Sequence, residues 1–129
     1  MNKVLITGAC GYLGARLCKH LAKDGYRVTA FDSYDPSAHT QWVSLMDEVV
    51  VGDIRDESTI SDLADKNFDV VVHLISLDHF KSEENPNYVS SINVVPTWNL
   101  LDKLTQNGLD KFIYFSTIHV YGKLPRETI

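Results

Sequence analysis

The feature that most restricts the fold of this chain is a glycine-spaced turn near its amino terminus. Residues 3–14 read KVLITGACGYLG, an apolar run followed by glycines at positions 8, 11 and 14. Such a run is typical of a strand buried on both faces of a sheet. Leu13, Leu17 and Leu21 then recur every four residues and predict an amphipathic helix over about 12–23. The segment therefore predicts a strand, a tight turn and a helix in direct succession.

The same alternation continues along the chain. Further strands are expected at 27–31, 48–51, 69–74 and 111–116, helices at about 57–66 and 88–106, and polar connections at 33–44 and 77–87. Because the strands are apolar throughout, the pattern predicts an α/β fold with a doubly wound, parallel, Rossmann-like sheet of order 3-2-1-4-5. Residues 1–129 are expected to form one such domain, truncated after the fifth strand.

The sequence also predicts the local roles of several side chains. Asp56 or Ser58 can cap the helix at 57–66. Pro96, inside the helix expected at 88–106, should kink that helix or mark its start. Trp42 and Trp98 are expected to pack rather than to stack on a ligand. One side of the helix at 88–106 should carry Val89, Ile92, Val95 or Pro96, Asn99 and Leu100.

Bulk properties exclude several classes of protein. With 129 residues the chain can form one domain with a real core, and its net charge of −5 disfavours nucleic acid or an anionic membrane as partner. Cys10 and Cys18 form neither a disulfide framework nor a metal-ligand spacing, which favours a reducing, cytoplasmic location. We expect no signal peptide, because the first strand starts at once, and no membrane span.

The glycine turn has the chemistry of a phosphate cradle. Gly8 can take a positive φ, Gly11 permits a close approach to a ligand, and Gly14 permits helix and strand to pack. Backbone amides near Tyr12 and Leu13 can then bind a pyrophosphate, helped by the helix dipole. The alternative is a glycine-rich turn without a ligand.

Asp32 closes the second strand, 18 residues after Gly14. A carboxylate there can accept from both ribose hydroxyls of an adenosine and would repel a 2′-phosphate, which predicts NAD rather than NADP. The alternative is an aspartate that caps a turn.

The spacing G-x-x-G-x-x-G, with GDIRD at 52–56 and STIHVYG at 116–122, resembles the extended short-chain dehydrogenase/reductase family, the NAD-dependent nucleotide-sugar epimerases and dehydratases. The resemblance implies that Asp53 accepts from the adenine amino group and that Ile54 packs on the ring. The alternative for this pair is a loop and cap.

The resemblance also implies roles further along the chain. A run after the fourth strand would line the pyrophosphate and the nicotinamide ribose: Leu74, Ile75 and Ser76. Asn93 would bond at the nicotinamide end or to nearby backbone, and Ser116 would lie against the cofactor. Thr117 would be the catalytic residue that holds the reacting substrate hydroxyl, or else a strand-terminal hydroxyl bonded to backbone. His73 is expected to be a buried strand histidine rather than a catalyst.

Two departures separate the chain from a complete family member. Asp78 stands where some sugar epimerases carry a lysine. The family's general base is a Tyr-x-x-x-Lys pair, and none of the six tyrosines has a lysine four residues later. The 129-residue chain alone is therefore expected to be inactive.

Other chemistry is not expected. The five histidines show no metal-ligand spacing, no G-x-S-x-G elbow indicates a hydrolase, and no lysine follows the glycines as in an NTPase.

Two functional hypotheses remain. The first is the NAD-binding part of an oxidoreductase whose partner is a nucleotide sugar. The second is a non-catalytic dinucleotide-binding or sensing module. A homo-oligomer is a further expectation, because the fifth strand would be an exposed sheet edge.

Overall fold

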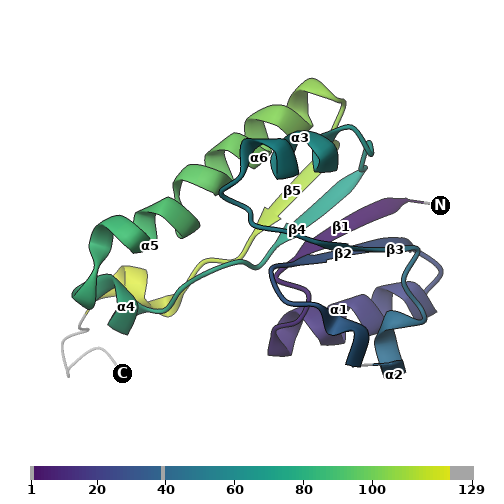
Figure 1. Ribbon diagram of the computed structural model, residues 1–129, viewed down its shortest axis with the longest axis horizontal. Coiled ribbons are helices and arrows are strands. Elements are labelled where there is room, and N and C mark those ends of the chain that lie inside the picture. Colours follow the sequence, from purple (N-terminus) through teal and green to yellow (C-terminus); the bar gives the residue numbers. More distant parts are fainter. Residues whose placement is uncertain (1, 39, 123–129) are drawn as a thin grey trace.

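A computed structural model describes residues 2–38 and 40–122 of the chain. Five parallel strands form one sheet of order β3-β2-β1-β4-β5, as predicted (Figure 1). The strands are β1 (Lys3–Thr7), β2 (Arg27–Asp32), β3 (Glu48–Val51), β4 (Val70–His73) and β5 (Lys111–Tyr114). The chain therefore reverses its winding direction between β1 and β4, where ligands of such sheets bind.

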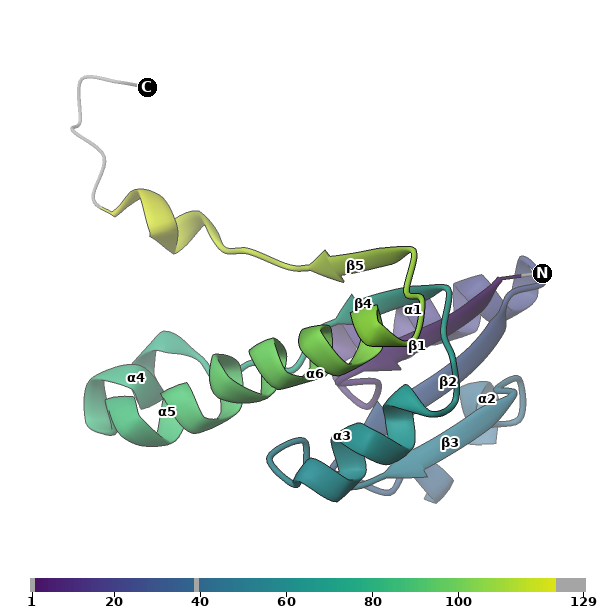
Figure 2. The same cartoon turned by 90° about the horizontal axis from the view of Figure 1, so that it is seen from above.

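Helices cover both faces of the sheet (Figures 1 and 2). One side carries α1 (Tyr12–Lys23), followed by the short segments η1 (Pro36–Ala38) and α2 (Thr40–Val43). The other side carries α3 (Glu57–Ala64) and α6 (Val95–Gln106). Three short elements lie near the carboxyl edge of the sheet: α4 (His79–Glu84), α5 (Pro86–Asn93) and η2 (Ile118–Tyr121).

Each covered face has its own hydrophobic core. Because successive side chains of a strand point to opposite faces, Val4 and Ile6 of β1 pack toward α1, and Leu5 packs toward α3 and α6. Trp42 is buried in the core on the α1 side of the sheet, which confirms its packing role. The two cores thus hold helices on both faces of the sheet and leave the carboxyl ends of its strands free to form a ligand site.

Some element boundaries differ from the prediction. The connections expected at 33–44 and 77–87 contain η1, α2 and α4. Within α1, the buried residues are Gly14 and Cys18, whereas Leu13 is 40% exposed. The N-cap of α3 is Asp56 rather than Ser58, and in the described chain its side chain makes no capping hydrogen bond.

The helix expected at 88–106 is two helices, which part at Val94. Pro96 lies in the first turn of α6, since its missing N–H prevents a continuous ladder but costs nothing at a helix start. The restart also changes which residues face the core. Pro96 and Leu100 are buried, whereas Val95 and Asn99 are exposed, so Asn99 does not share the buried side as expected. Trp98 is 74% exposed, so the prediction that it packs is wrong.

Candidate functional site

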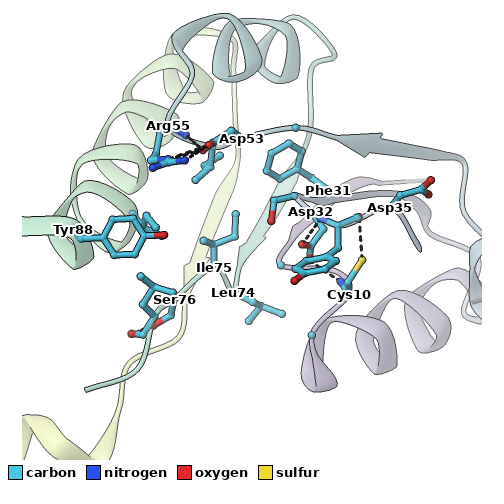
Figure 3. A pocket seen from close by; sticks show the side chains of 18 residues that line it. Cys10, Phe31, Asp32, Asp35, Asp53, Arg55, Leu74, Ile75, Ser76 and Tyr88 are labelled. Carbon is cyan, nitrogen blue, oxygen red and sulfur yellow. Dashed lines mark hydrogen bonds and ion pairs between the residues drawn. The ribbon is translucent and has the colours of Figure 1, made fainter. Parts of the chain in front are cut away.

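A large open cavity lies at the carboxyl edge of the sheet (Figure 3). Its volume is about 810 Å³, and it extends from the glycine turn across the ends of β2 and β3 to α5. The side chains drawn around it come from separate parts of the chain, and include Cys10, Asp32, Asp53, Arg55, Ile75 and Tyr88. A cavity of this kind at the switch point of a parallel sheet is a candidate ligand site.

The glycine turn has the geometry that the sequence predicts at two positions. Gly8 has a φ of +72°, and a Cβ atom there would lie 3.0 Å from the carbonyl carbon of Leu74. At Gly14 a Cβ atom would lie 2.1 Å from the Gly8 carbonyl oxygen. Gly11 is the N-cap of α1, so the amides of Tyr12 and Leu13 lie in the first turn, where a helix leaves its donors unpaired.

Asp32 lies directly against this turn. Its Oδ2 accepts a hydrogen bond from the Cys10 amide at 2.8 Å, and its Oδ1 accepts from the Tyr34 amide at 3.1 Å. Burial, together with the Asp32 charge, raises the pKa of the Cys10 thiol to about 11. The thiol therefore stays neutral at physiological pH, and the negative charge at this end of the cavity comes from Asp32 and from the neighbouring Asp35.

Asp53 lies on the opposite wall and already has a partner. The Arg55 guanidinium forms an ion pair with its carboxylate, and the Arg55 amide donates to Asp53 Oδ1 at 2.9 Å. These hydrogen bonds lower the pKa of Asp53. An adenine amino group would have to share these acceptors with Arg55. The neighbouring Ile54 lines the cavity but is largely buried in the core.

Sequence reasoning missed Arg55 as a site residue. The stretch GDIRD shows an arginine two residues after the aspartate, but only the turn after β3 folds the guanidinium back onto Asp53.

A smaller cavity of about 260 Å³ adjoins the first. The two share part of the glycine turn and the segment after β4: Gly8, Gly11, Leu74, Ile75 and Ser76. The other residues that line the smaller cavity are Tyr12, Leu13, Gly14, His73, Tyr114 and Phe115. The glycine turn therefore lies between two hollows, an arrangement that suits a ligand with two bulky ends and a phosphate bridge.

His73 is buried at the end of β4, as predicted. Its Nδ1 lies 2.8 Å from Thr7 Oγ1, and its Nε2 lies 2.9 Å from Thr97 Oγ1. Burial lowers the pKa of His73 to about 4, so the ring is neutral at pH 7.

Asn93 bonds to backbone, which is one of the two alternatives that the sequence left open. Its Oδ1 accepts from the Leu77 amide at 2.8 Å, and its Nδ2 donates to the Leu77 carbonyl at 3.0 Å.

Comparison with known proteins identifies the family. A model of the NAD dependent epimerase/dehydratase family matches residues 4–129, nearly the whole chain. This chain belongs to the NAD dependent epimerase/dehydratase family. The resemblance in its glycine turn, its GDIRD stretch and its last strand is thereby confirmed.

Relatives of this chain are epimerases of different nucleotide sugars. It is 30% identical over 135 residues to a UDP-glucose 4-epimerase of Pisum sativum, and 36% identical over 130 residues to a CDP-paratose 2-epimerase of Salmonella typhi. The structure of UDP-glucose-4-epimerase from Stenotrophomonas maltophila, with bound NAD and formylated UDP-arabinopyranose, matches all of this chain and 41% of that one, with a TM-score of 0.84 and 26% identity.

The epimerase/dehydratase chain spans about 38% of the length of the curated relatives that it matches. Within the described residues, Ser116 and Thr117 are exposed beyond the end of β5 and line neither of the two cavities. The Thr117 carbonyl accepts from the Val120 amide at 3.3 Å. Their roles in this epimerase/dehydratase chain stay predictions.

Two further findings concern residues 2–38 and 40–122. No cluster of three or more His, Cys, Asp or Glu side chains there could hold a metal ion. In that same part of the chain, every helix is too short or too polar to cross a membrane.

Proposed function

We propose that residues 1–129 form the NAD-binding domain of a nucleotide-sugar epimerase or dehydratase. The observation that carries the proposal is the contact of the Asp32 carboxylate with the Cys10 amide. This contact supports a site in which the acceptor for a ribose lies beside the amides for a pyrophosphate. The two free cysteines, one buried and one partly buried, support a cytoplasmic location.

The two cavities support a division of the cofactor site. The adenosine end would occupy the larger cavity, with Asp32 on its ribose and Asp53 and Ile54 on its adenine. The pyrophosphate would lie over Gly8, Gly11, Gly14 and the amides of Tyr12 and Leu13. The nicotinamide end would occupy the smaller cavity, beside Leu74, Ile75 and Ser76. Ser116, which directly follows the lining residue Phe115, would lie against the cofactor at this end.

In the intact protein, the proposed activity is an isomerisation or dehydration of a sugar. Bound NAD would supply the chemistry of accepting a hydride from a sugar carbon and returning it. Thr117 would orient the sugar hydroxyl that loses its proton. Because no tyrosine in this sequence has a lysine four residues later, we propose that the 129-residue chain turns over no nucleotide sugar. Epimerisation of UDP-glucose by the purified chain with NAD would contradict this.

Calorimetric titration with NAD and NADP tests cofactor binding. We expect NAD to bind at least about tenfold more tightly than NADP, because a charge-assisted bond to the ribose contributes about 1.5–3 kcal/mol and a 2′-phosphate would meet the Asp32 charge. Asp32→Asn is the matched variant: it keeps one acceptor oxygen, which can serve the Cys10 amide, while it removes the charge and the second acceptor, which serves the Tyr34 amide. This variant should bind NAD more weakly than the unchanged chain and should lose most of the preference for NAD over NADP. If the folded chain gives no heat with either coenzyme, the proposal is wrong.

The second candidate, a sensing module, shares this binding site. The observation behind it is confined to residues 1–129: these residues offer a dinucleotide site, and none of their six tyrosines has a lysine four residues later. Activity of the full-length gene product toward nucleotide sugars separates the two candidates, because a sensor would bind NAD but show no turnover.

A further inference from the structure

The segment from Leu74 to Leu77 runs past both cavities and is held at each end. At its start, the Leu74 amide donates both to the Thr7 carbonyl and to Thr7 Oγ1, each at 3.2 Å, and Thr7 is the last residue of β1. At its end, both backbone groups of Leu77 bond to the side chain of Asn93 at 2.8 and 3.0 Å. The segment is thus held by Thr7 of the sheet at one end and by Asn93 of α5 at the other.

His73 connects these two contacts through hydrogen bonds whose directions can be assigned. The Thr97 hydroxyl donates to the Asn93 carbonyl at 2.8 Å, which uses its single proton. It must therefore accept from His73 Nε2–H, at 2.9 Å. His73 Nδ1 is then the acceptor of the Thr7 hydroxyl, at 2.8 Å. With the hydroxyl directions assigned in this way, the hydrogen-bond network favours the neutral Nε2–H tautomer.

The environment of His73 favours this neutral form. The side chain is 1% exposed, and its ring lies 5.8 Å from the ring of Phe112 and 6.0 Å from that of Tyr114. A buried polar ring with both nitrogens paired resists displacement, because breaking either bond leaves a donor or acceptor unsatisfied.

The segment in turn limits the position of the glycine turn. A Cβ atom added at Gly8 would lie 3.0 Å from the Leu74 carbonyl carbon and 3.1 Å from the Ile75 nitrogen. The two backbones are therefore in direct contact, and a shift of residues 74–77 would displace the turn or open a gap beside it.

We propose that His73 is a positioning residue of the dinucleotide site, which holds residues 74–77 against the glycine turn through Thr7, Thr97 and Asn93. This inference rests on the function proposed above. It assigns a role to a histidine that sequence reasoning treated as part of the core, and it makes Thr97 necessary for the site although Thr97 lines neither of the cavities described.

Thr97 offers the sharpest test, because one substitution removes its hydroxyl at nearly constant volume. We expect Thr97→Val to raise the Kd for NAD about tenfold, since the preorganised segment relaxes, and Thr97→Ser to stay within about twofold of the unchanged chain. Ile60→Val, which trims a buried methylene from α3, controls for lost stability and should leave the Kd unchanged.

Two measurements on the ligand-free protein complete the test. Nitrogen-15 NMR should show His73 protonated on Nε2 and not on Nδ1 at pH 7. Hydrogen exchange of the Leu77 amide should be faster in Thr97→Val than in Ile60→Val.

The outcomes separate the two proposals. An unchanged chain that binds NAD, with Thr97→Val binding equally well or with His73 in the Nδ1–H form, overturns the positioning role and leaves the proposed function intact. An unchanged chain that binds neither NAD nor NADP overturns the proposed function itself, and the positioning role with it.

Discussion

Gly14 shows how strictly one position of the glycine turn is constrained. A Cβ atom there would lie 2.1 Å from the Gly8 carbonyl oxygen, on backbone that cannot move without displacing β1 from α1. We expect Gly14→Ala to lower the free energy of unfolding by about 3 kcal/mol or more. Urea denaturation followed by circular dichroism measures this. Gly52→Ala is the control: its nearest contact is a Thr59 side-chain atom at 3.2 Å, so it should cost clearly less.

Two buried threonines on neighbouring strands give a second comparison at this scale. Thr7 and Thr29 are both fully buried, but only the Thr7 hydroxyl has a hydrogen-bond partner among the described residues. We expect Thr29→Val to be neutral or to stabilise by up to about 1 kcal/mol, and Thr7→Val to destabilise by about 1–3 kcal/mol. Thermal and urea unfolding check both variants. Equal losses for the two would mean that the hydroxyl of Thr29 is also satisfied.

At the scale of single elements, the start of α5 depends on its capping side chain. Asn85 Oδ1 accepts from the Tyr88 amide at 3.0 Å, whereas the Asp56 side chain at the start of α3 makes no such bond in the described chain. We expect Asn85→Ala to cost about 1 kcal/mol and Asn85→Asp to keep most of the stability. Asp56→Ala should cost less than Asn85→Ala in the same denaturation assay; the opposite order would contradict the assignment of the caps.

The helices also show where sequence patterns succeed. The prediction that Pro96 would kink or start a helix is confirmed, because a missing N–H acts locally. Of the side predicted for α6, Pro96 and Leu100 are buried but Asn99 is exposed, and Trp98, which was expected to pack, is exposed as well. The predicted side was counted at helical spacing from Tyr88 as if the helix were continuous. Because a new helix begins at Val95, the residues after it face other directions than that count gives.

For the molecule as a whole, His73 predicts a dependence of stability on pH. Its pKa falls from an ordinary 6.5 to about 4 on folding, because burial disfavours the charged ring. The unfolded chain therefore binds the proton more readily between these values. The contribution of His73 is complete above about pH 6.5 and is lost as the pH falls toward 4, by up to about 3 kcal/mol.

Urea unfolding at pH 7 and pH 5 tests this dependence. His73→Gln, which cannot titrate, should be less stable than the unchanged chain at pH 7 but should lose less stability between the two values. An equal loss in both chains would assign the acid sensitivity to other groups.

The arrangement of the whole sheet predicts self-association. Strand β5 forms one edge, and Ile113 and Tyr114 are 37% and 50% exposed (Figure 2). Exposed apolar edges pair with other chains. We expect analytical ultracentrifugation to show dimers whose fraction rises with protein concentration, and Ile113→Lys to reduce that fraction. A monomer at all concentrations would contradict this prediction.

The sequence by itself determined the order of the strands and the edge of the sheet at which the candidate site lies. Apolar runs, right-handed crossovers and a glycine turn are local features or follow from general rules of connection, and they placed Gly8, Gly14 and Asp32 together at the carboxyl edge of the sheet. Only the tertiary structure decided how those residues are held. The bonds from Asp32 to Cys10, from Asn93 to Leu77 and from His73 to Thr7 and Thr97 join positions 16 to 66 residues apart. No local pattern encodes such pairs, because they exist only once packing has brought the ends of separate elements together.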